Sequence, residues 1–132
     1  MIQLDGSHGE GGGALVRTAL AFATLTGKEV KINNIRAGRP KPGLKAQHLT
    51  VIRALQEMSG AKCTDIHLGA EEIMFIPGKI KRGNYSFDIG TAGSISLFLQ
   101  GVILPSMFAP GKVTITVKGG TCGKWQASVE YI

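Results

Sequence analysis

The chain has 132 residues, of which 43% are hydrophobic and 18% charged, so it is long enough to bury a core without disulfides or a structural metal. Fifteen basic residues outnumber nine acidic ones, and the formal net charge of +6 favours a polyanionic partner. Aromatic residues make up only 6%, which argues against a platform that stacks single-stranded bases. Cys63 and Cys122 form neither a disulfide framework nor a metal-ligand pattern, and the longest apolar run, near 95–104, is too short to span a bilayer. We therefore expect a cytoplasmic protein with no membrane partner, folded as a single domain over residues 1–132.

The first segment predicts a strand, a glycine loop and a helix. The strand covers 2–5, the loop covers 6–13, and the helix runs from about 14 to 26 and ends at Gly27. Such an arrangement favours phosphate binding, because glycines let backbone N–H groups face the anion at a helix N-terminus. The loop lacks the Walker sequence and a clean dinucleotide fingerprint, so alone it is a weak signal.

Two charged residues of this segment are candidate ligand groups. Glu10 lies within the glycine loop, where its carboxylate would repel phosphate unless a divalent metal lay between them. The alternative is an acid stabilised by the helix dipole. Arg17 lies within a turn of the helix start, away from the face expected to pack on the core. That face comprises Leu15, Ala19, Phe22 and Ala23.

A basic loop follows the second strand, which we expect over 30–35. Pro40 and Pro42 stiffen the loop, and they disfavour helix for the residues before them. Between Glu29 and Glu57 there is no acidic residue. Arginine forks and the N–H groups of the following helix suit a phosphate, whereas the alternative is a solvated surface loop. The basic side chains of the loop and the helix start are Arg36, Arg39, Lys41 and Lys45.

The next helix should run from about 44 to 59 and end at Gly60. Gln47 and His48 fall in its first turns. His48 is near the edge of the apolar stripe, where a histidine is more often a half-buried structural side chain than a catalyst. Two strands are then expected, over 61–66 and 73–77.

A second round begins after a basic connector over 79–82, which we expect to be a solvated turn. It comprises a strand over 85–88, a glycine-rich segment over 89–94, a helix to about 107 and a strand over 113–117. This helix is apolar nearly all round, which predicts deep burial. Gln100 would then be a buried amide whose partner is either a ligand, such as a purine base, or nearby backbone. No element is evident over 122–132.

Taken together, these stretches resemble the N-terminal part of the RNA 3′-terminal phosphate cyclases. The resemblance is collinear and extends to about Thr121. The matching stretches are Leu4-Asp5-Gly6, Gly9-Glu10-Gly11-Gly12-Gly13, Arg17, Ile35-Arg36-Ala37-Gly38-Arg39, Lys41-Pro42-Gly43-Leu44, Gln47-His48-Leu49, Gly90-Thr91-Ala92-Gly93-Ser94, Leu99-Gln100 and Gly119-Gly120-Thr121.

The resemblance implies an α+β fold of repeated βαβαββ units, like the C-terminal domain of a translation initiation factor. One unit would be complete over 1–78, a second would begin over 84–121, and 122–132 would form a tail of unclear structure. It also implies an ATP-dependent ligase-class reaction that converts an RNA 3′-phosphate into a 2′,3′-cyclic phosphate by adenylyl transfer. ATP and a divalent metal, Mg²⁺ or Mn²⁺, would be the cofactors, and RNA 3′ ends the substrate.

The family pattern also implies roles for individual residues. Glu10 would hold the metal, and Gln100 would contact the nucleotide. The remaining site residues would bind RNA or phosphate: Arg17, Arg36, Arg39, Lys41, Gln47 and His48.

One departure from the pattern bears on activity. The family's adenylylated histidine lies in a C-terminal motif that these residues do not include, so the chain resembles a partial enzyme that is inactive alone. An unfinished sheet edge would favour a homo-oligomer or a completing chain. The alternatives are a non-catalytic RNA- or nucleotide-binding module and, more distantly, an enolpyruvyl-transferase relative.

Overall fold

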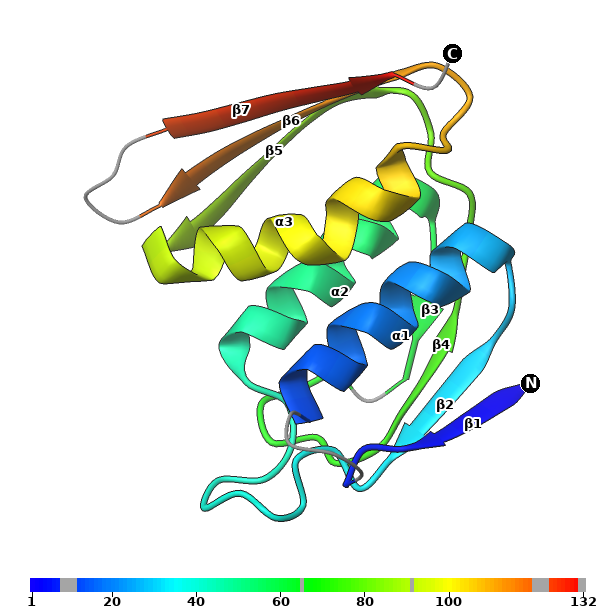
Figure 1. Ribbon diagram of the computed structural model, residues 1–132, viewed down its shortest axis with the longest axis vertical. Helices are drawn as coiled ribbons and strands as arrows, with labels where there is room; N and C mark the ends of the chain where they lie inside the picture. Colours follow the sequence, from blue (N-terminus) through cyan, green and yellow to red (C-terminus); the bar gives the residue numbers. More distant parts are fainter. Residues whose placement is uncertain (8–11, 65, 91, 120–123, 131–132) are drawn as a thin grey trace.

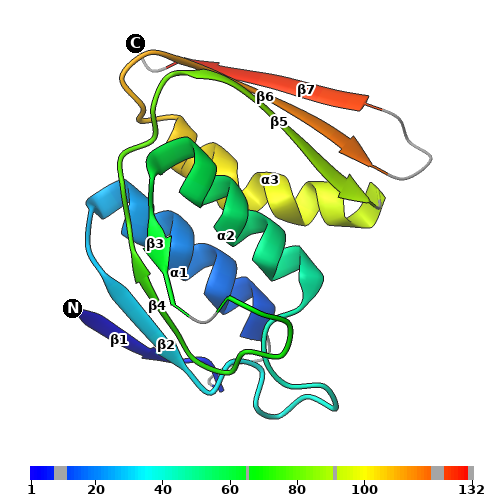
Figure 2. The same cartoon turned by 180° about the vertical axis from the view of Figure 1, so that it is seen from behind.

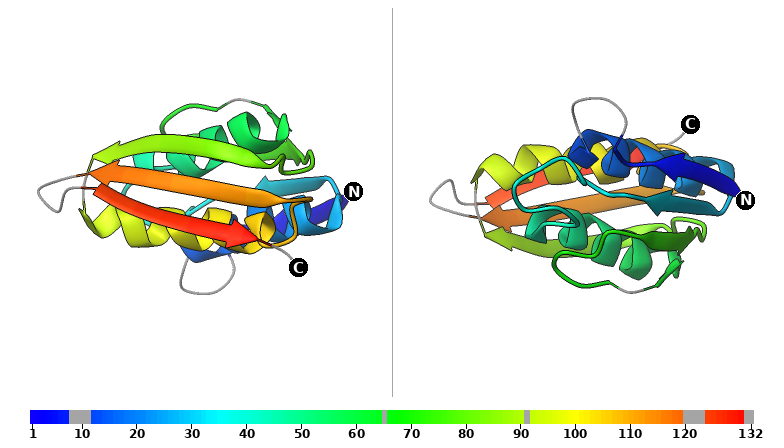
Figure 3. Two further views of the ribbon diagram at one scale, coloured as in Figure 1. Left: turned by 90° about the horizontal axis from the view of Figure 1, so that it is seen from above. Right: turned by 90° about the horizontal axis from the view of Figure 1, so that it is seen from below.

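The computed structural model describes residues 1–7, 12–64, 66–90, 92–119 and 124–130. In these ranges three helices lie between two β-sheets, as seen from the side in Figure 1 and from above and below in Figure 3. The α+β class expected from the sequence is confirmed. No helix of the described ranges is long and apolar enough to cross a membrane.

The first sheet has the strand order β1-β2-β4-β3. Strands β1 (Ile2–Asp5) and β2 (Val30–Asn33) are parallel, and helix α1 (Gly12–Thr26) connects them. After β2, helix α2 (Ala46–Ser59) leads to β3 (Lys62–Cys63) and β4 (Ile73–Ile76), and β4 pairs antiparallel with both β2 and β3. Figure 2 shows this sheet from behind, with α1 and α2 on its inner side.

The second sheet has the order β5-β6-β7. Strands β5 (Gly83–Gly90) and β6 (Lys112–Gly119) are parallel and joined by helix α3 (Ala92–Ser106), which repeats the β1-α1-β2 arrangement. Strand β7 (Lys124–Glu130) pairs antiparallel with β6 along its length. The sequence analysis predicted no element here, although residues 124–130 alternate apolar and polar side chains as a strand does. The repeated βαβαββ units, one complete and a second only begun, remain a prediction.

Helix α2 contributes the largest share of the core between the sheets. Ile52 and Leu55 are fully buried, and Ile32 of β2 and Phe75 of β4 pack in the same cluster. Both glycines predicted to end helices do so, since Gly27 and Gly60 each have a left-handed φ of 74°.

Two predictions about the helix faces were wrong in part. Ala19 and Ala23 of α1 are buried as expected, but Phe22 is 50% exposed, and Val16 and Leu20 complete the buried face. Helix α3 is not buried all round, because Leu104 is 45% exposed. Both helices pack against a sheet and against each other, so only the remaining side of each, which carries Phe22 or Leu104, is exposed.

The connector over 79–82 also differs from the expected solvated turn. Ile80 is only 4% exposed and belongs to the core cluster, although Lys79, Lys81 and Arg82 are exposed. One apolar side chain thus anchors an otherwise polar connector.

Candidate functional site

The basic loop between β2 and α2 begins with a sharp reversal around Ile35. Ile35 is fully buried, and the two residues beside it, Asn34 and Arg36, both have a φ of 53°. Positive φ is uncommon for residues other than glycine, so the surrounding contacts must hold this backbone. The buried Ile35 side chain supplies one of these contacts.

Hydrogen bonds fix the far end of the loop. The Gly43 N–H donates to the Ile35 carbonyl at 2.8 Å, and the Leu44 N–H donates to the Ala70 carbonyl at 2.9 Å. The Gly69 N–H in turn donates to the Leu44 carbonyl at 2.8 Å. The loop is therefore tied both to its own start and to the segment before β4.

Three predicted phosphate or RNA ligands and their neighbours surround a hollow of about 670 Å³ beside this loop. Because Ala46 and Gln47 lie in the first turn of α2, the backbone N–H groups there lack intrahelical partners. Leu68, 65% exposed, lies on its rim. Arg39 is exposed and does not line the hollow. The charged and amide side chains that do line it are Arg36, Lys41, Lys45 and Gln47.

His48 is more deeply placed than the sequence predicted, since it is 1% exposed. Its Nδ1 accepts a hydrogen bond from the Lys45 backbone N–H at 2.9 Å and so caps helix α2. Burial, and after it the positive charges of Arg17, Arg36 and Lys45, together lower the pKa of His48 from 6.5 to about 4. The ring is neutral at pH 7, and because Nδ1 is the acceptor, Nε2 carries the proton.

The Nε2–H of His48 is buried and has no hydrogen-bond partner among the described residues. A buried donor without a partner carries a desolvation cost, which an anionic oxygen between the nearby cations would relieve. Sequence reasoning missed the capping role of His48. The available signal was its position three residues after Lys45, where a side chain can reach back to the N-cap N–H.

A second hollow of about 190 Å³ brings together two residues that are far apart in sequence. Arg17 of α1 and Gln100 of α3 both line it. Gln100 is exposed, so the expectation of a buried amide was wrong: it lies on the open side of α3. In the described parts of the chain the Arg17 guanidinium makes no ion pair.

Both hollows lie close to His48. The positive charges of Arg17 and Arg36, which line different hollows, each lower the pKa of His48. Figure 1 shows the N-terminal ends of α1 and α2 at the same end of the molecule as the 34–45 loop. Glu10, the predicted metal ligand, lies outside the described residues. Among those that are described, no three His, Cys, Asp or Glu side chains form a metal-binding group.

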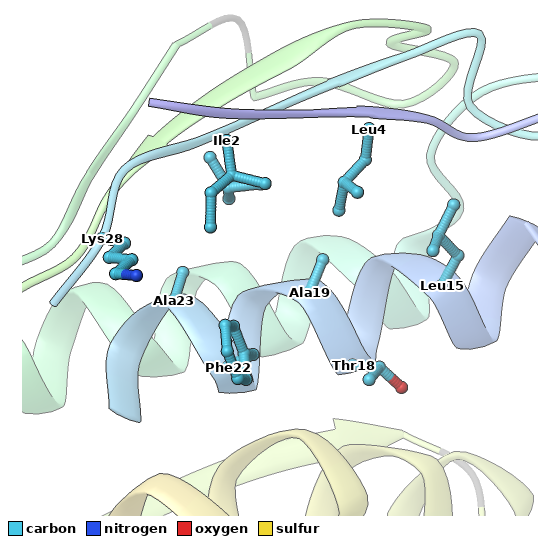
Figure 4. Close-up of a pocket in the computed structure, with 9 residues that line it drawn as sticks. Ile2, Leu4, Leu15, Thr18, Ala19, Phe22, Ala23 and Lys28 are labelled. Carbon is cyan, nitrogen blue, oxygen red and sulfur yellow. The ribbon is translucent and has the colours of Figure 1, made fainter. Parts of the chain in front are cut away.

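An apolar groove between β1 and α1 does not belong to this site. Ile2 and Leu4 point from β1 toward Ala19 and Ala23 of α1, as Figure 4 shows. The groove has a volume of about 250 Å³, and its lining is almost wholly apolar. Lys28 is the one charged side chain among the described residues that line it.

Comparison with known proteins adds an independent observation. A family model described as RNA 3′-terminal phosphate cyclase matches residues 8–132. Three similar relatives carry the name RNA 3′-terminal phosphate cyclase. The relative from Methanopyrus kandleri is 50% identical over 131 residues, or 99% of this chain and 37% of its own length. The Archaeoglobus fulgidus relative is 52% identical over 131 residues, or 99% of this chain and 40% of its own length.

The third, from Pyrococcus furiosus, is 48% identical over 132 residues, or 100% of this chain and 39% of its own length. The chain thus spans 37–40% of the length of these curated relatives. The matched region contains both hollows and the loop between them.

Proposed function

Because the chain belongs to the RNA 3′-terminal phosphate cyclase family, we propose that it supplies the phosphate- and nucleotide-binding part of the ATP-dependent conversion of an RNA 3′-phosphate into a 2′,3′-cyclic phosphate. One observation carries the proposal. Arg17 of α1 and Lys45 at the start of α2 lie close enough to His48 for their charges to lower its pKa, and the buried Nε2–H of His48 has no partner among the described residues. Such a preorganised group of donors suits an oxyanion.

We divide the site by the chemistry of its two hollows. The larger one, at about 670 Å³, lies within the size range of ligand pockets, roughly 300–1,000 Å³, and would take the RNA terminus. The smaller one, at about 190 Å³, would take part of the adenine nucleotide, with Arg17 on a phosphate and Gln100 on the base. Arg39, exposed on the loop, would meet a neighbouring phosphate.

In adenylyl transfer, negative charge develops on phosphoryl oxygens. Arg17, Lys41 and Lys45 would stabilise that charge, while neutral His48 would donate its Nε2–H. A divalent metal, if Glu10 holds it, would supply further charge neutralisation. We expect the chain alone to bind but not to cyclise, because the family's nucleophilic histidine lies in a C-terminal motif that these 132 residues lack.

Nucleotide binding tests the proposal directly. Titration of the chain with ATP in Mn²⁺ should give measurable heat, and Arg17→Gln or Gln100→Ala should each weaken binding by about tenfold, the effect of losing one charged or polar contact. Arg53→Gln, an exposed charge on α2, is the matched control and should bind as the wild type does. Absence of nucleotide binding by the wild-type chain would refute the proposal.

A non-catalytic RNA-binding module is the second candidate, which the basic hollow beside the 36–43 loop favours. It would bind RNA in a salt-sensitive manner, irrespective of ATP and of the 3′ end. A preference for 3′-phosphorylated over 3′-hydroxyl RNA would exclude it. The match over residues 8–132 favours either candidate over an enolpyruvyl-transferase relative.

A further inference from the structure

The Arg36 guanidinium is already engaged inside its own loop. Its Nη1 donates to the Lys41 carbonyl at 2.7 Å and to the Gly43 carbonyl at 3.0 Å. One arginine nitrogen thus bridges two carbonyls across the loop. Hydrogen bonds from a charged donor are stronger than neutral ones, so this bridge is a principal tie of the segment.

We infer that Arg36 is a positioning residue, which holds the 36–43 loop so that Lys41 and the first turn of α2 face the bound phosphate. This inference rests on the proposed function. It assigns Arg36 a role different from that of a phosphate ligand, which the family resemblance implies.

The backbone of the loop supports the inference. Arg36 itself has a φ of 53°, a conformation that a non-glycine residue keeps only when contacts impose it. The bridge from its side chain and the Gly43 N–H bond to Ile35 close the loop from both sides. Without the bridge, the Lys41 carbonyl would lose its bond to the Arg36 side chain, and the tip of the loop would be held by its backbone bonds alone.

The side chain that the loop presents is Lys41. It is exposed, lines the larger hollow, and contributes only its backbone carbonyl to the bridge. Replacing Lys41 therefore removes a charge without touching the bridge. Replacing Arg36 by lysine keeps a charge, but the shorter side chain ends one atom before the position of Nη1, the nitrogen that bridges the two carbonyls. These two variants therefore distinguish a residue that positions the loop from a residue that contacts the phosphate.

The test measures binding of a 3′-phosphorylated RNA oligonucleotide as a function of salt. Each lost phosphate contact lowers the slope of log affinity against log salt by about 0.7 for a single strand. We expect Lys41→Gln to lower the slope by that amount. Arg36→Lys should reduce affinity by about tenfold at unchanged slope, and Arg53→Gln should change neither.

Two results together would overturn the inference. They are wild-type affinity in Arg36→Lys, and a slope in Arg36→Gln that is lowered as much as in Lys41→Gln. Together they would show that Arg36 contacts a phosphate directly. Amide hydrogen exchange gives a readout that needs no RNA. The Gly43 amide should exchange about tenfold faster in Arg36→Lys, but at the wild-type rate in Lys41→Gln.

An unchanged Gly43 exchange rate in Arg36→Lys would also overturn the inference. A wild-type chain that binds no RNA would instead refute the proposed function. The exchange rates would still decide the role of Arg36 in the loop.

Discussion

Replacing Gly43 with alanine is expected to destabilise the protein by about 2–5 kcal/mol, through backbone strain and steric overlap together. Gly43 has a φ of 89°, which alanine adopts only with strain. An added Cβ would overlap the Gly69 carbonyl and lie 2.7 Å from the Gly69 Cα. The neighbour is backbone, which is itself hydrogen-bonded to Leu44, so it cannot move aside without breaking that bond.

Gly38→Ala is the matched control for Gly43→Ala. Gly38 belongs to the same loop, has no positive φ, and has no atom within 4 Å of an added Cβ. Thermal unfolding should therefore show a melting temperature lowered by about 10 °C or more for Gly43→Ala, against little change for Gly38→Ala. Equal melting temperatures for the two variants would show that the contact between the 43 and 69 backbones does not hold in solution.

Lowering the pH is expected to destabilise the folded protein through His48. The pKa of His48 is about 4 in the folded protein and 6.5 in the unfolded reference, so the unfolded chain binds a proton first as the pH falls. The stability from neutral His48 is complete above pH 6.5 and is lost as the pH falls from 6.5 to about 4. Its full size is about 3 kcal/mol, since each pKa unit corresponds to about 1.4 kcal/mol.

His48→Gln isolates this contribution. Glutamine at this helix position can accept the Lys45 N–H, as in a capping box, but it does not titrate. Urea unfolding at pH 7, 5.5 and 4 should show the wild type losing about 3 kcal/mol more than His48→Gln does. His67→Gln, at an exposed histidine, controls for removal of an imidazole. Parallel stability curves for wild type and His48→Gln would contradict the burial of a neutral ring.

The elements with local signals were predictable from sequence. Gly27 and Gly60 marked the ends of α1 and α2, and β1 has the predicted bounds. Strand β7 was missed although Trp125, Ala127 and Val129 alternate with polar residues, so a strand signal was available in the sequence. The exposed side of α3 was missed because apolar content does not reveal which side a neighbour covers.

The sequence named candidate site residues but did not give their arrangement. Composition and motif order identified Arg17, Arg36 and Gln100 as candidates. The bridge from Arg36 arises only because the backbone reverses at Asn34 and Arg36 in a conformation that no sequence pattern of non-glycine residues signals. The cap by His48 likewise depends on where α2 begins, at Ala46 and not at Leu44.

The two parallel strand pairs also set the kinetics of folding. β1 meets β2, and β5 meets β6, only after the chain has closed a loop that contains a whole helix. Such non-local pairing slows a two-state domain relative to a helical bundle, because loop-closure entropy is lost before the contacts form. β7 joins β6 through a short connection and adds no such barrier. The rate-limiting events of folding should therefore be the two crossovers through α1 and α3, and mutations in these helices should slow refolding more than mutations in β7 do.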